Sequence, residues 1–387
     1  MSPSSLSVIQ PLPNATGTPE FESKRKSILD EFASKVPQEL RLPPSIIENP
    51  PKNVTGVPRE CGLLTAREIE ITEKYDAFAL AQAIAAKQLT SVEVAIAFSK
   101  RAIIAHQLTC CLMEWFMDEA VSRAKELDDH LAKTGETVGP LHGVPISIKE
   151  HMSIAGHITT YGFLETHRKD AYDNQMEAIL RRAGAVFFCK TIQPQSIMHL
   201  ESVSIYGRVL NPYNINLSAG GSSGGEAALI AMNGSPLGVG TDIGGSIRCP
   251  SAFCGIYGFK ATSETLPTKG IKASLLPAEI NVTCSTGPMC NSLRDMELFM
   301  KVVKGAKPHL EDPRLVPIPW TGLETPKKTP LKIGFLMDDG DIKPQPPVTR
   351  ALEWVQSQLG KHVEFELKPF KPFKTEELMK NIRLAVS

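Results

Sequence analysis

The sequence predicts an α/β fold built on a mixed, largely buried β-sheet. From about residue 60 onward, segments with helical periodicity alternate with short apolar runs of strand length. This alternation is typical of α/β proteins, and no internal repeat suggests a solenoid or a propeller. A hydrophobic content of 42% and a charged content of 22% are those of an ordinary globular chain.

The elements follow from local patterns. Thr90 and Glu93 form a capping box, which predicts a helix from there to about His106. Further helices are expected at residues 22–35, 118–133, 173–183, 225–232 and 348–360. Strands are expected at residues 144–149, 185–189, 331–336 and 362–367.

The domain organisation is expected to be simple. Residues 1–57 are rich in Pro and Ser, and we interpret them as a partly helical arm that lies on the main domain, residues 58–387. The Pro-rich stretch 305–330 is expected to be a surface excursion. The N-terminus lacks the pattern of a signal peptide, and no apolar run reaches the roughly 18 residues of a membrane span.

Composition excludes several classes of function. The chain has 42 Lys+Arg against 42 Asp+Glu, so no basic excess indicates a nucleic-acid partner. Eight irregularly spaced cysteines without a C-x-x-C pair favour a reducing, cytoplasmic setting. The nine histidines lack metal-ligand spacing, and we expect neither a metal nor a cofactor. A membrane partner is not expected.

The densest motif is SAGGSSGGE, residues 218–226, which ends at an apolar helix pattern. Such a turn at a helix N-terminus could bind phosphate, but no Gly-Lys-[Ser/Thr] follows, so the P-loop interpretation fails. Gly220, Ser222 and Gly224 also match G-x-S-x-G, the nucleophile elbow of α/β-hydrolases. That alternative needs a downstream histidine, and its candidates are His309 and His362.

A second motif, GVGTDIGGSIRCP at 238–250, places two glycines directly before Ser246. Consecutive N–H groups in such a turn form an anion nest, hence a candidate oxyanion hole. Asp242 and Arg248 flank the serine, and a structural ion pair that holds the turn is the preferred interpretation of these two residues.

A third motif, GPLHGVPISIKE at 139–150, ends an apolar strand pattern with Lys149. Burial disfavours the charged form of lysine, so a buried Lys149 could act as a base. His142 is the competing base, but a lone histidine in a Gly/Pro turn is more typical of a structural role.

Together the three motifs resemble the amidase signature family. The segment GGSSGGEAALIAMNGSPLGVGTDIGGSIRCPSAFCGIYGFK, at 220–260, matches the family signature almost throughout. Two further segments, VPRECGLLTAREIEITEKYDA at 57–77 and AFSKRAIIAHQLTCCLMEW at 97–115, are similar to the fungal acetamidase and general amidase branch.

The resemblance implies a mixed central sheet with helices on both faces and an amide hydrolase with a Ser–cis-Ser–Lys triad. It assigns the nucleophile to Ser246, the bridging serine to Ser222 and the base to Lys149. The family uses these groups to cleave a small carboxamide to a carboxylate and ammonia or an amine. The remaining implied roles are a supporting hydrogen bond for Ser223, a place in the acyl pocket for Ile197, and oxyanion-hole N–H groups of Ile243, Gly244, Gly245 and Ser246.

Several alternatives stay open at this stage. An esterase or an aryl acylamidase would share the acyl-enzyme mechanism. Family chains continue well past residue 387, so a C-terminally truncated member with little activity is a second class. The function of an amidotransferase subunit that acts on acyl-tRNA is disfavoured by the fungal-amidase-like segments and the neutral net charge. The expected partner is a small-molecule amide, and a homodimer stays open.

Overall fold

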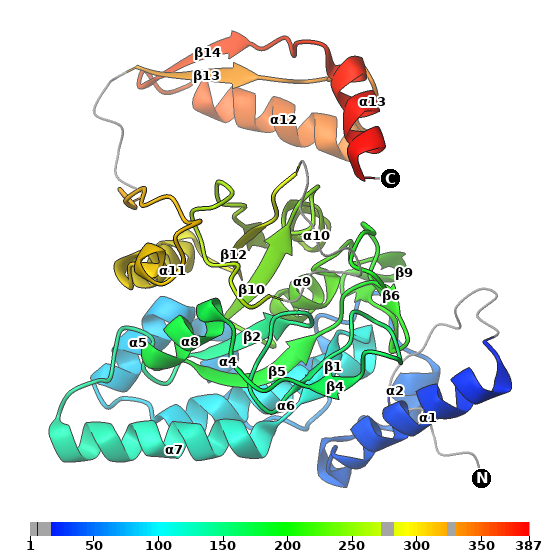
Figure 1. The fold of residues 1–387 in the computed structure, drawn as a ribbon, viewed down its shortest axis with the longest axis vertical. Coiled ribbons are helices and arrows are strands. Elements are labelled where there is room, and N and C mark those ends of the chain that lie inside the picture. Colours follow the sequence, from blue (N-terminus) through cyan, green and yellow to red (C-terminus); the bar gives the residue numbers. More distant parts are fainter. Residues whose placement is uncertain (1–5, 7–16, 272–281, 323–329, 387) are drawn as a thin grey trace. The chain divides into compact units, whose positions relative to one another are not determined.

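A six-stranded mixed sheet lies at the centre of the first of two structural units, Met1–Trp320 and Thr321–Ser387 (Figure 1). The computed structural model describes residues 6, 17–271, 282–322 and 330–386. The strand order is β1-β5-β2-β10-β12-β11. These strands are β1 (Leu112–Trp115), β2 (Pro145–Lys149), β5 (Val186–Thr191), β10 (Leu237–Asp242), β11 (Tyr257–Gly258) and β12 (Ser285–Cys290).

Parallel and antiparallel pairing both occur in this sheet. Strands β5, β2 and β10 run parallel to one another, whereas β1 and β12 pair antiparallel with β5 and β10. The prediction of a mixed sheet is therefore confirmed. Five two-residue strands and one five-residue strand form three separate two-stranded ladders. These ladders pair β3 (Ile158–Thr159) with β4 (Arg168–Lys169), β6 (Val203–Ser204) with β7 (Gly207–Arg208), and β8 (Leu210–Asn211) with β9 (Asn214–Ser218).

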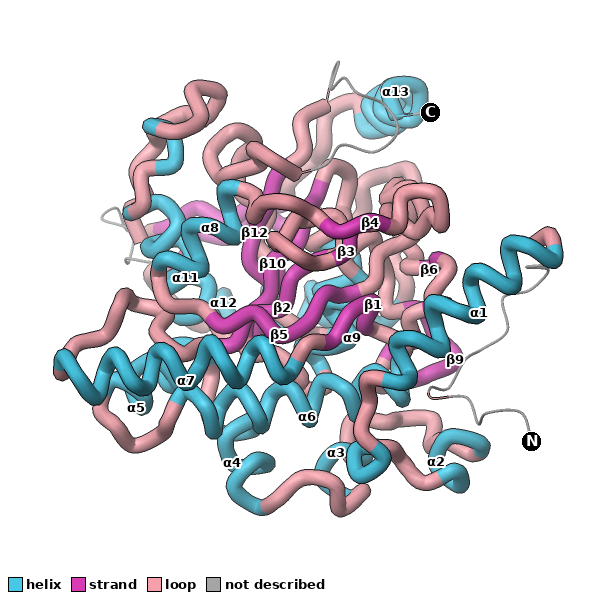
Figure 2. The backbone as a smooth tube through the Cα atoms, turned by 60° about the horizontal axis from the view of Figure 1, so that its bottom comes forward, coloured by secondary structure: helices cyan, strands magenta, loops and turns pink. Residues whose placement is uncertain are grey.

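Helices surround the sheet on both sides, as Figure 2 shows, so the predicted α/β class is confirmed. The α-helices of the first unit are α1 (Pro19–Ser34), α2 (Pro44–Glu48), α3 (Val57–Glu60), α4 (Ala66–Lys74), α5 (Ala77–Ala85), α6 (Ser91–Thr109), α7 (Met117–Thr134), α8 (Gln175–Arg182), α9 (Gly224–Ala231), α10 (Arg248–Cys254) and α11 (Leu293–Gly305). Short 3₁₀ turns occur at Gln38–Leu40 and Pro308–Leu310.

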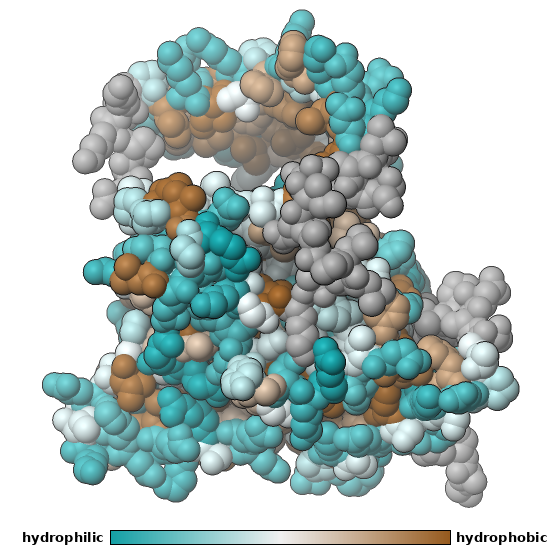
Figure 3. All heavy atoms as spheres, in the orientation of Figure 1, coloured by the Kyte–Doolittle hydropathy of each residue, from teal (hydrophilic) through white to brown (hydrophobic). Residues whose placement is uncertain are grey.

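Two long helices illustrate how the sequence pattern sets burial. Helix α6 begins at the predicted capping box and buries 15 of its 19 residues, because its apolar residues encircle the helix. Helix α7 is amphipathic: Ala120, Ala124, Leu127 and Leu131 are buried, and charged side chains cover its outer face (Figure 3). These two helices pack against each other, and α7 also packs on β5.

The N-terminal residues contribute to the core of the first unit. The predicted helix at 22–35 is α1, and Phe32 packs its ring on His106 of α6 at a centroid distance of 4.7 Å. Val36, Leu40 and Val54 are buried in the hydrophobic core. The arm that the sequence suggests is thus built into the unit from about residue 36 onward.

The second unit contains a parallel pair of strands, β13 (Leu331–Phe335) and β14 (Phe365–Pro369), joined through α12 (Pro346–Leu359). Helix α13 (Thr375–Val386) follows. Strand β14 begins three residues after the predicted start at 362. Part of the predicted 305–330 excursion, residues 323–329, lies outside the described residues. Within the part of the chain that the structure describes, no helix has the length and apolarity needed to cross a membrane.

Candidate active site

Lys149 lies at the end of the central strand β2 and is fully buried. Its Nζ donates to Ser222 Oγ at 2.6 Å and to Thr241 Oγ1 at 3.0 Å. Burial lowers the pKa of Lys149 to about 7. In a substantial fraction of the molecules, the Lys149 amine is therefore neutral at physiological pH and can accept a proton.

Ser222 lies in the glycine-rich turn that precedes α9, and its peptide bond with Gly221 is cis. The glycines are required by close packing as well as by backbone angles. Gly220 has φ +82°, and a Cβ atom at Gly221 would lie 2.7 Å from the carbonyl oxygen of His199. Ser202 Oγ accepts from Gly224 N at 3.1 Å and donates to Gly220 O at 3.1 Å. These contacts hold the Ser222 hydroxyl over Lys149.

Asp242 organises the second glycine turn, which follows β10. Its carboxylate accepts from Gly245 N at 2.7 Å, Ile247 N at 3.1 Å and Arg248 Nε at 2.9 Å. Burial opposes its ionisation, but the hydrogen bonds from Arg248 and the backbone outweigh burial and hold the pKa of Asp242 far below its usual range. The Asp242–Arg248 ion pair therefore closes the turn around Ser246.

The contact with Asp242 occupies the Gly245 N–H, which the family resemblance assigns to the oxyanion hole. Gly245 has φ +125°, a conformation that only glycine adopts readily. Within the described residues, the N–H groups of Ile243, Gly244 and Ser246 have no partner. Those three N–H groups therefore stay available in this turn, and Gly245 supports its shape.

The structure brings Ser246 to the same place as the other two motifs. Its side chain is nearly buried, and its carbonyl oxygen accepts from Ser223 N at 3.0 Å. Ser223 Oγ donates to Thr241 O at 3.4 Å, so Ser223 ties both glycine turns to β10. The three predicted segments therefore converge at the ends of β2 and β10.

Four of the other predicted candidates lie outside this contact network. His142 accepts from Val138 N at 3.1 Å, which is a structural contact in its own turn. In the described part of the chain, no histidine forms a hydrogen bond with Ser222 or Ser246, and this disfavours the elbow interpretation with His309 or His362. Ile197 adopts φ +70° in the segment before His199, which packs against Gly221.

Sequence reasoning did not assign roles to Thr241, Ser202 and Glu226, which all contact this site or its support. Glu226 is the last residue of the SAGGSSGGE motif, and its carboxylate accepts from Ser147 Oγ at 2.5 Å and Thr191 Oγ1 at 2.9 Å. Burial raises the pKa of Glu226 to about 7. The sequence contained a signal for the contact between Ser147 and Glu226. The two-residue period of a strand places Ser147 on the same face of β2 as Lys149.

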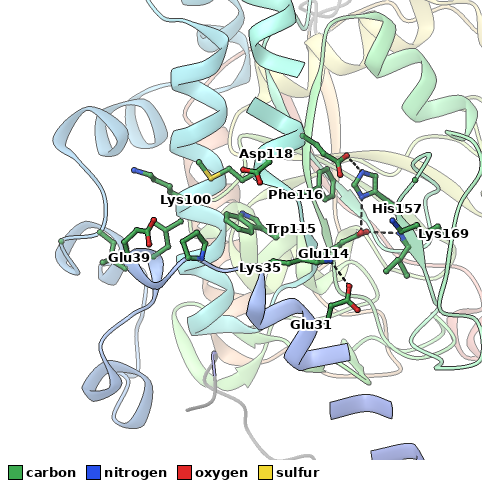
Figure 4. A pocket seen from close by; sticks show the side chains of 18 residues that line it. Glu31, Lys35, Glu39, Lys100, Glu114, Trp115, Phe116, Asp118, His157 and Lys169 are labelled. Atoms are coloured by element: carbon green, nitrogen blue, oxygen red, sulfur yellow. Dashed lines mark hydrogen bonds and ion pairs between the residues drawn. The ribbon is translucent and has the colours of Figure 1, made fainter. Parts of the chain in front are cut away.

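A cavity of about 660 Å³ lies elsewhere, between α1, β1 and the start of α7 (Figure 4). None of Lys149, Ser222 and Ser246 lines it. The His157 ring lies 3.9 Å from that of Phe116, and its nitrogens lie 3.3 Å from Glu114 and 3.1 Å from Glu119. This cavity therefore combines paired charges with aromatic rings, without a nucleophile beside a base.

Comparison with known proteins identifies the family. The family model for amidases matches residues 93–387. The chain belongs to the amidase signature family. A candidate amidase of Schizosaccharomyces pombe is 49% identical over 322 residues, which cover 83% of this chain and 60% of that protein. An acetamidase of Emericella nidulans is 40% identical over 351 residues, which cover 89% of this chain and 63% of that protein.

Solved structures of the amidase signature family share the fold. A fatty acid amide hydrolase superposes with a TM-score of 0.88 at 36% identity, over 95% of this chain and 65% of that one. A bacterial aryl acylamidase superposes with a TM-score of 0.69 at 21% identity, over 81% of this chain and 64% of that one, and supports the fold alone. The chain thus spans slightly less than two thirds of the length of these relatives.

Proposed function

We propose that this chain is an amide hydrolase that cleaves a carboxamide through an acyl-enzyme on Ser246. The observation that carries the proposal is the 2.6 Å contact between the fully buried Lys149 Nζ and Ser222 Oγ, beside the turn that holds Ser246. A serine hydroxyl is a weak nucleophile until a base removes its proton. A neutral Lys149 is suited to remove that proton through the bridging hydroxyl of Ser222.

In the first step, Lys149 takes the proton of Ser222, and Ser222 takes the proton of Ser246. The Ser246 oxygen then bonds to the carbonyl carbon of the amide, and the carbonyl electrons move onto its oxygen. The N–H groups of Ile243, Gly244 and Ser246 stabilise that oxyanion. Each such donor typically contributes about 3–4 kcal/mol to the transition state.

In the second step, the proton returns along the same hydroxyls to the leaving nitrogen, and the C–N bond breaks. Water then attacks the ester on Ser246, with the relay again acting as general base. Ammonia or an amine leaves first and the carboxylate leaves second. This sequence needs neither a metal ion nor an organic cofactor.

The substrate class is proposed as small carboxamides, because the relatives to which this chain is similar include an acetamidase. The similarity to a fatty acid amide hydrolase makes amides with longer acyl chains the second candidate. We further propose a cytoplasmic location, since all eight cysteines are free thiols.

Release of ammonia from acetamide, hexanamide, benzamide and oleamide by the purified chain tests this function, with the matching ethyl esters as comparison. We expect turnover of at least one amide that disappears in Ser246→Ala. Failure to hydrolyse any amide, in a chain that is folded by circular dichroism, would contradict the proposal. Hydrolysis of the esters alone would replace it with an esterase function.

A further inference from the structure

Glu226 projects from the first turn of α9 toward β2 and β5 and is fully buried. Its two carboxylate oxygens are held by Ser147 and Thr191, at 2.5 Å and 2.9 Å. Ser147 lies two residues before Lys149 on β2, and Thr191 is the register partner of Lys149 on β5. The hydroxyls that hold Glu226 therefore flank the Lys149 backbone on the same face of the sheet.

The surroundings of Glu226 accommodate both of its protonation states. Ser147 Oγ also lies 2.9 Å from Ser235 Oγ, and Ser235 Oγ donates to Leu237 O at 2.8 Å. When Glu226 is ionised, Ser147 donates its proton to the carboxylate. When Glu226 is protonated, it can donate to Ser147, which then donates to Ser235. No buried hydroxyl is left without a partner in either state.

The titratable groups that face Lys149 electrostatically are Cys284, Asp242, Glu226, Glu150 and His151. Burial lowers the pKa of His151 well below its ordinary value, so its ring is neutral near pH 7. Asp242 is already paired with Arg248, and Lys190 is the main charge acting on Glu150. Cys284 is a thiol, and its Sγ donates to the carbonyl oxygen of Ser285 at 3.7 Å.

Glu226 differs from these groups in its own neighbours. The groups that face it are Lys149, the two hydroxyls and the thiols of Cys111 and Cys189. Within the described residues, Lys149 is the cation that acts on Glu226. Its negative charge is therefore available to Lys149 and is not offset by a second cation.

We propose that Glu226 is a positioning residue that supplies the counter-charge for the Lys149 ammonium formed when Ser222 gives up its proton. This inference rests on the proposed function of Lys149. Proton transfer from Ser222 turns a neutral amine into a buried cation, which is costly in a low-dielectric interior. The ionised Glu226 offsets that charge across the two strands, while its hydroxyl partners hold it in place. Glu226 itself does not contact the substrate.

The Glu226→Gln variant separates charge from shape. The glutamine oxygen can accept from Thr191, its amide can donate to Ser147, and Ser147 can then donate to Ser235, so the hydrogen bonds persist. Glu177→Gln is the matched control, because Glu177 is equally buried on α8 but interacts with Lys190, Asp173 and Arg181. Both variants remove one buried carboxyl group, and only one of the two faces Lys149.

The direct measurement is the pKa of Lys149, followed by NMR of ε-¹³C-labelled lysines, with Lys149→Met to assign the signal. We expect Glu226→Gln to lower this pKa by about 1–3 pH units, as loss of a close opposite charge does. The acid limb of the rate of amide hydrolysis should move down by the same amount, with a slower plateau. Glu177→Gln should leave both quantities unchanged.

Failure of the counter-charge role and failure of the proposed function give different results. If Lys149 keeps its pKa in Glu226→Gln while amide hydrolysis persists, the counter-charge role is wrong and the proposed function stands. If the pKa falls but the parent chain hydrolyses no amide, the electrostatic coupling stands and the proposed function fails. A variant that melts earlier and slows equally at every pH would reduce Glu226 to a structural role and overturn the inference.

Discussion

At the scale of single residues, two buried lysines on neighbouring strands show how surroundings decide chemistry. Lys149 and Lys190 are both fully buried, and burial lowers the pKa of each. Lys190 donates to the carbonyl oxygen of Ile158 at 2.6 Å and to Thr159 Oγ1 at 3.0 Å, and it is surrounded by carboxyl groups, including Glu150 and Glu114. Lys149 instead donates to the hydroxyls of Ser222 and Thr241. Only Lys149 is therefore placed to exchange a proton with a serine.

The pH dependence of hydrolysis follows from Lys149. Its pKa is lowered to about 7, so the neutral base is lost as pH falls through that value. We expect kcat/KM to drop about tenfold per pH unit below it. Lys149→Ala should be slower by several orders of magnitude and recover partly at high pH, where hydroxide replaces the base. Lys169→Ala, at an exposed lysine, is the control and should keep the parent profile.

An acid limb that stays near pH 7 in Lys149→Ala would show that another group is the base. In that case the Lys149–Ser222 contact would be structural.

The sequence could identify Lys149, Ser222 and Ser246 as candidates because each stands in a dense local motif. Thr241 and Glu226 were not assigned roles, although both lie within those motifs. Their contacts depend on which residues of β2, β5 and β10 face one another, and that register is set by tertiary packing. Local patterns therefore located the chemistry, whereas the supporting contacts required the fold.

At the scale of elements, the turn between β10 and α10 depends on one carboxylate. Asp242 is fully buried, while the Arg248 side chain is 55% exposed. The ion pair across this turn is therefore partly screened by solvent, and the backbone contacts to Gly245 and Ile247 carry more of its stability. The same contacts fix the N–H groups beside Ser246.

Asp242→Asn tests this arrangement. Loss of the charge should destabilise the fold by about 1–3 kcal/mol and displace the anion nest. Hydrolysis should slow by about 10²–10³, the usual effect of a lost oxyanion donor. Arg248→Met should cost less than about 1 kcal/mol, because its side chain is exposed. Urea denaturation and kcat provide the two readouts, and equal losses in both variants would contradict the ranking.

Asp242 also makes the stability of the fold depend on pH in the acid range. The pKa of Asp242 is lowered in the fold, so its stabilisation is fully present above the unfolded value of about 3.9 and is lost as pH falls toward the folded value. Between about pH 5 and pH 2, the parent should therefore lose more stability than Asp242→Asn does. Parallel acid denaturation curves for the two proteins would contradict this assignment.

Helix α9 packs against the sheet through a glycine. A Cβ atom at Gly225 would lie 2.5 Å from Ile192 N and 2.6 Å from Cys111 O, and backbone cannot move aside cheaply. Gly225→Ala should therefore cost about 1–3 kcal/mol or more and shift Ser222. Gly305→Ala is the control, because nothing lies within 4 Å of its Cβ position. Thermal melts compare the two, and an equal Tm would refute the packing argument.

The helices and strands that the sequence predicted are all present, and further elements of both kinds were not expected. The capping box at Thr90 and the apolar periodicity of α6 and α7 are local signals, and the structure confirms both helices. Strands β10 and β12 were not expected, because glycine and proline weaken the strand pattern in Leu237–Asp242 and Ser285–Cys290. Their pairing across six residues compensates for that weak propensity.

At the scale of the whole molecule, the proposed machinery belongs to one of the two units. Lys149, Ser222, Glu226 and Ser246 all lie within Met1–Trp320. That unit combines a mixed sheet, the helices packed on it and an N-terminal segment that enters its core. Sequence patterns indicated the α/β class, but the division near Trp320 was not expected, since the predicted boundary lay at residue 57.

The cysteines provide a test of the whole fold. All eight are free; Cys61, Cys249 and Cys284 are partly exposed and the others are buried. We expect at most three thiols to react rapidly with Ellman's reagent in the native protein and all eight to react after denaturation. The Tm should not change with dithiothreitol. Rapid reaction of more than three thiols in the native protein would contradict the described packing.

The most direct test of the account is to identify the residue that a fluorophosphonate labels. The parent chain should form one phosphonyl adduct, which peptide mass spectrometry locates on Ser246. Ser246→Ala should form none, and Ser222→Ala should label the same residue more slowly, because the relay to Lys149 is broken. An adduct on Ser222, or undiminished labelling of Ser246→Ala, would contradict the assignment of Ser246 as the nucleophile.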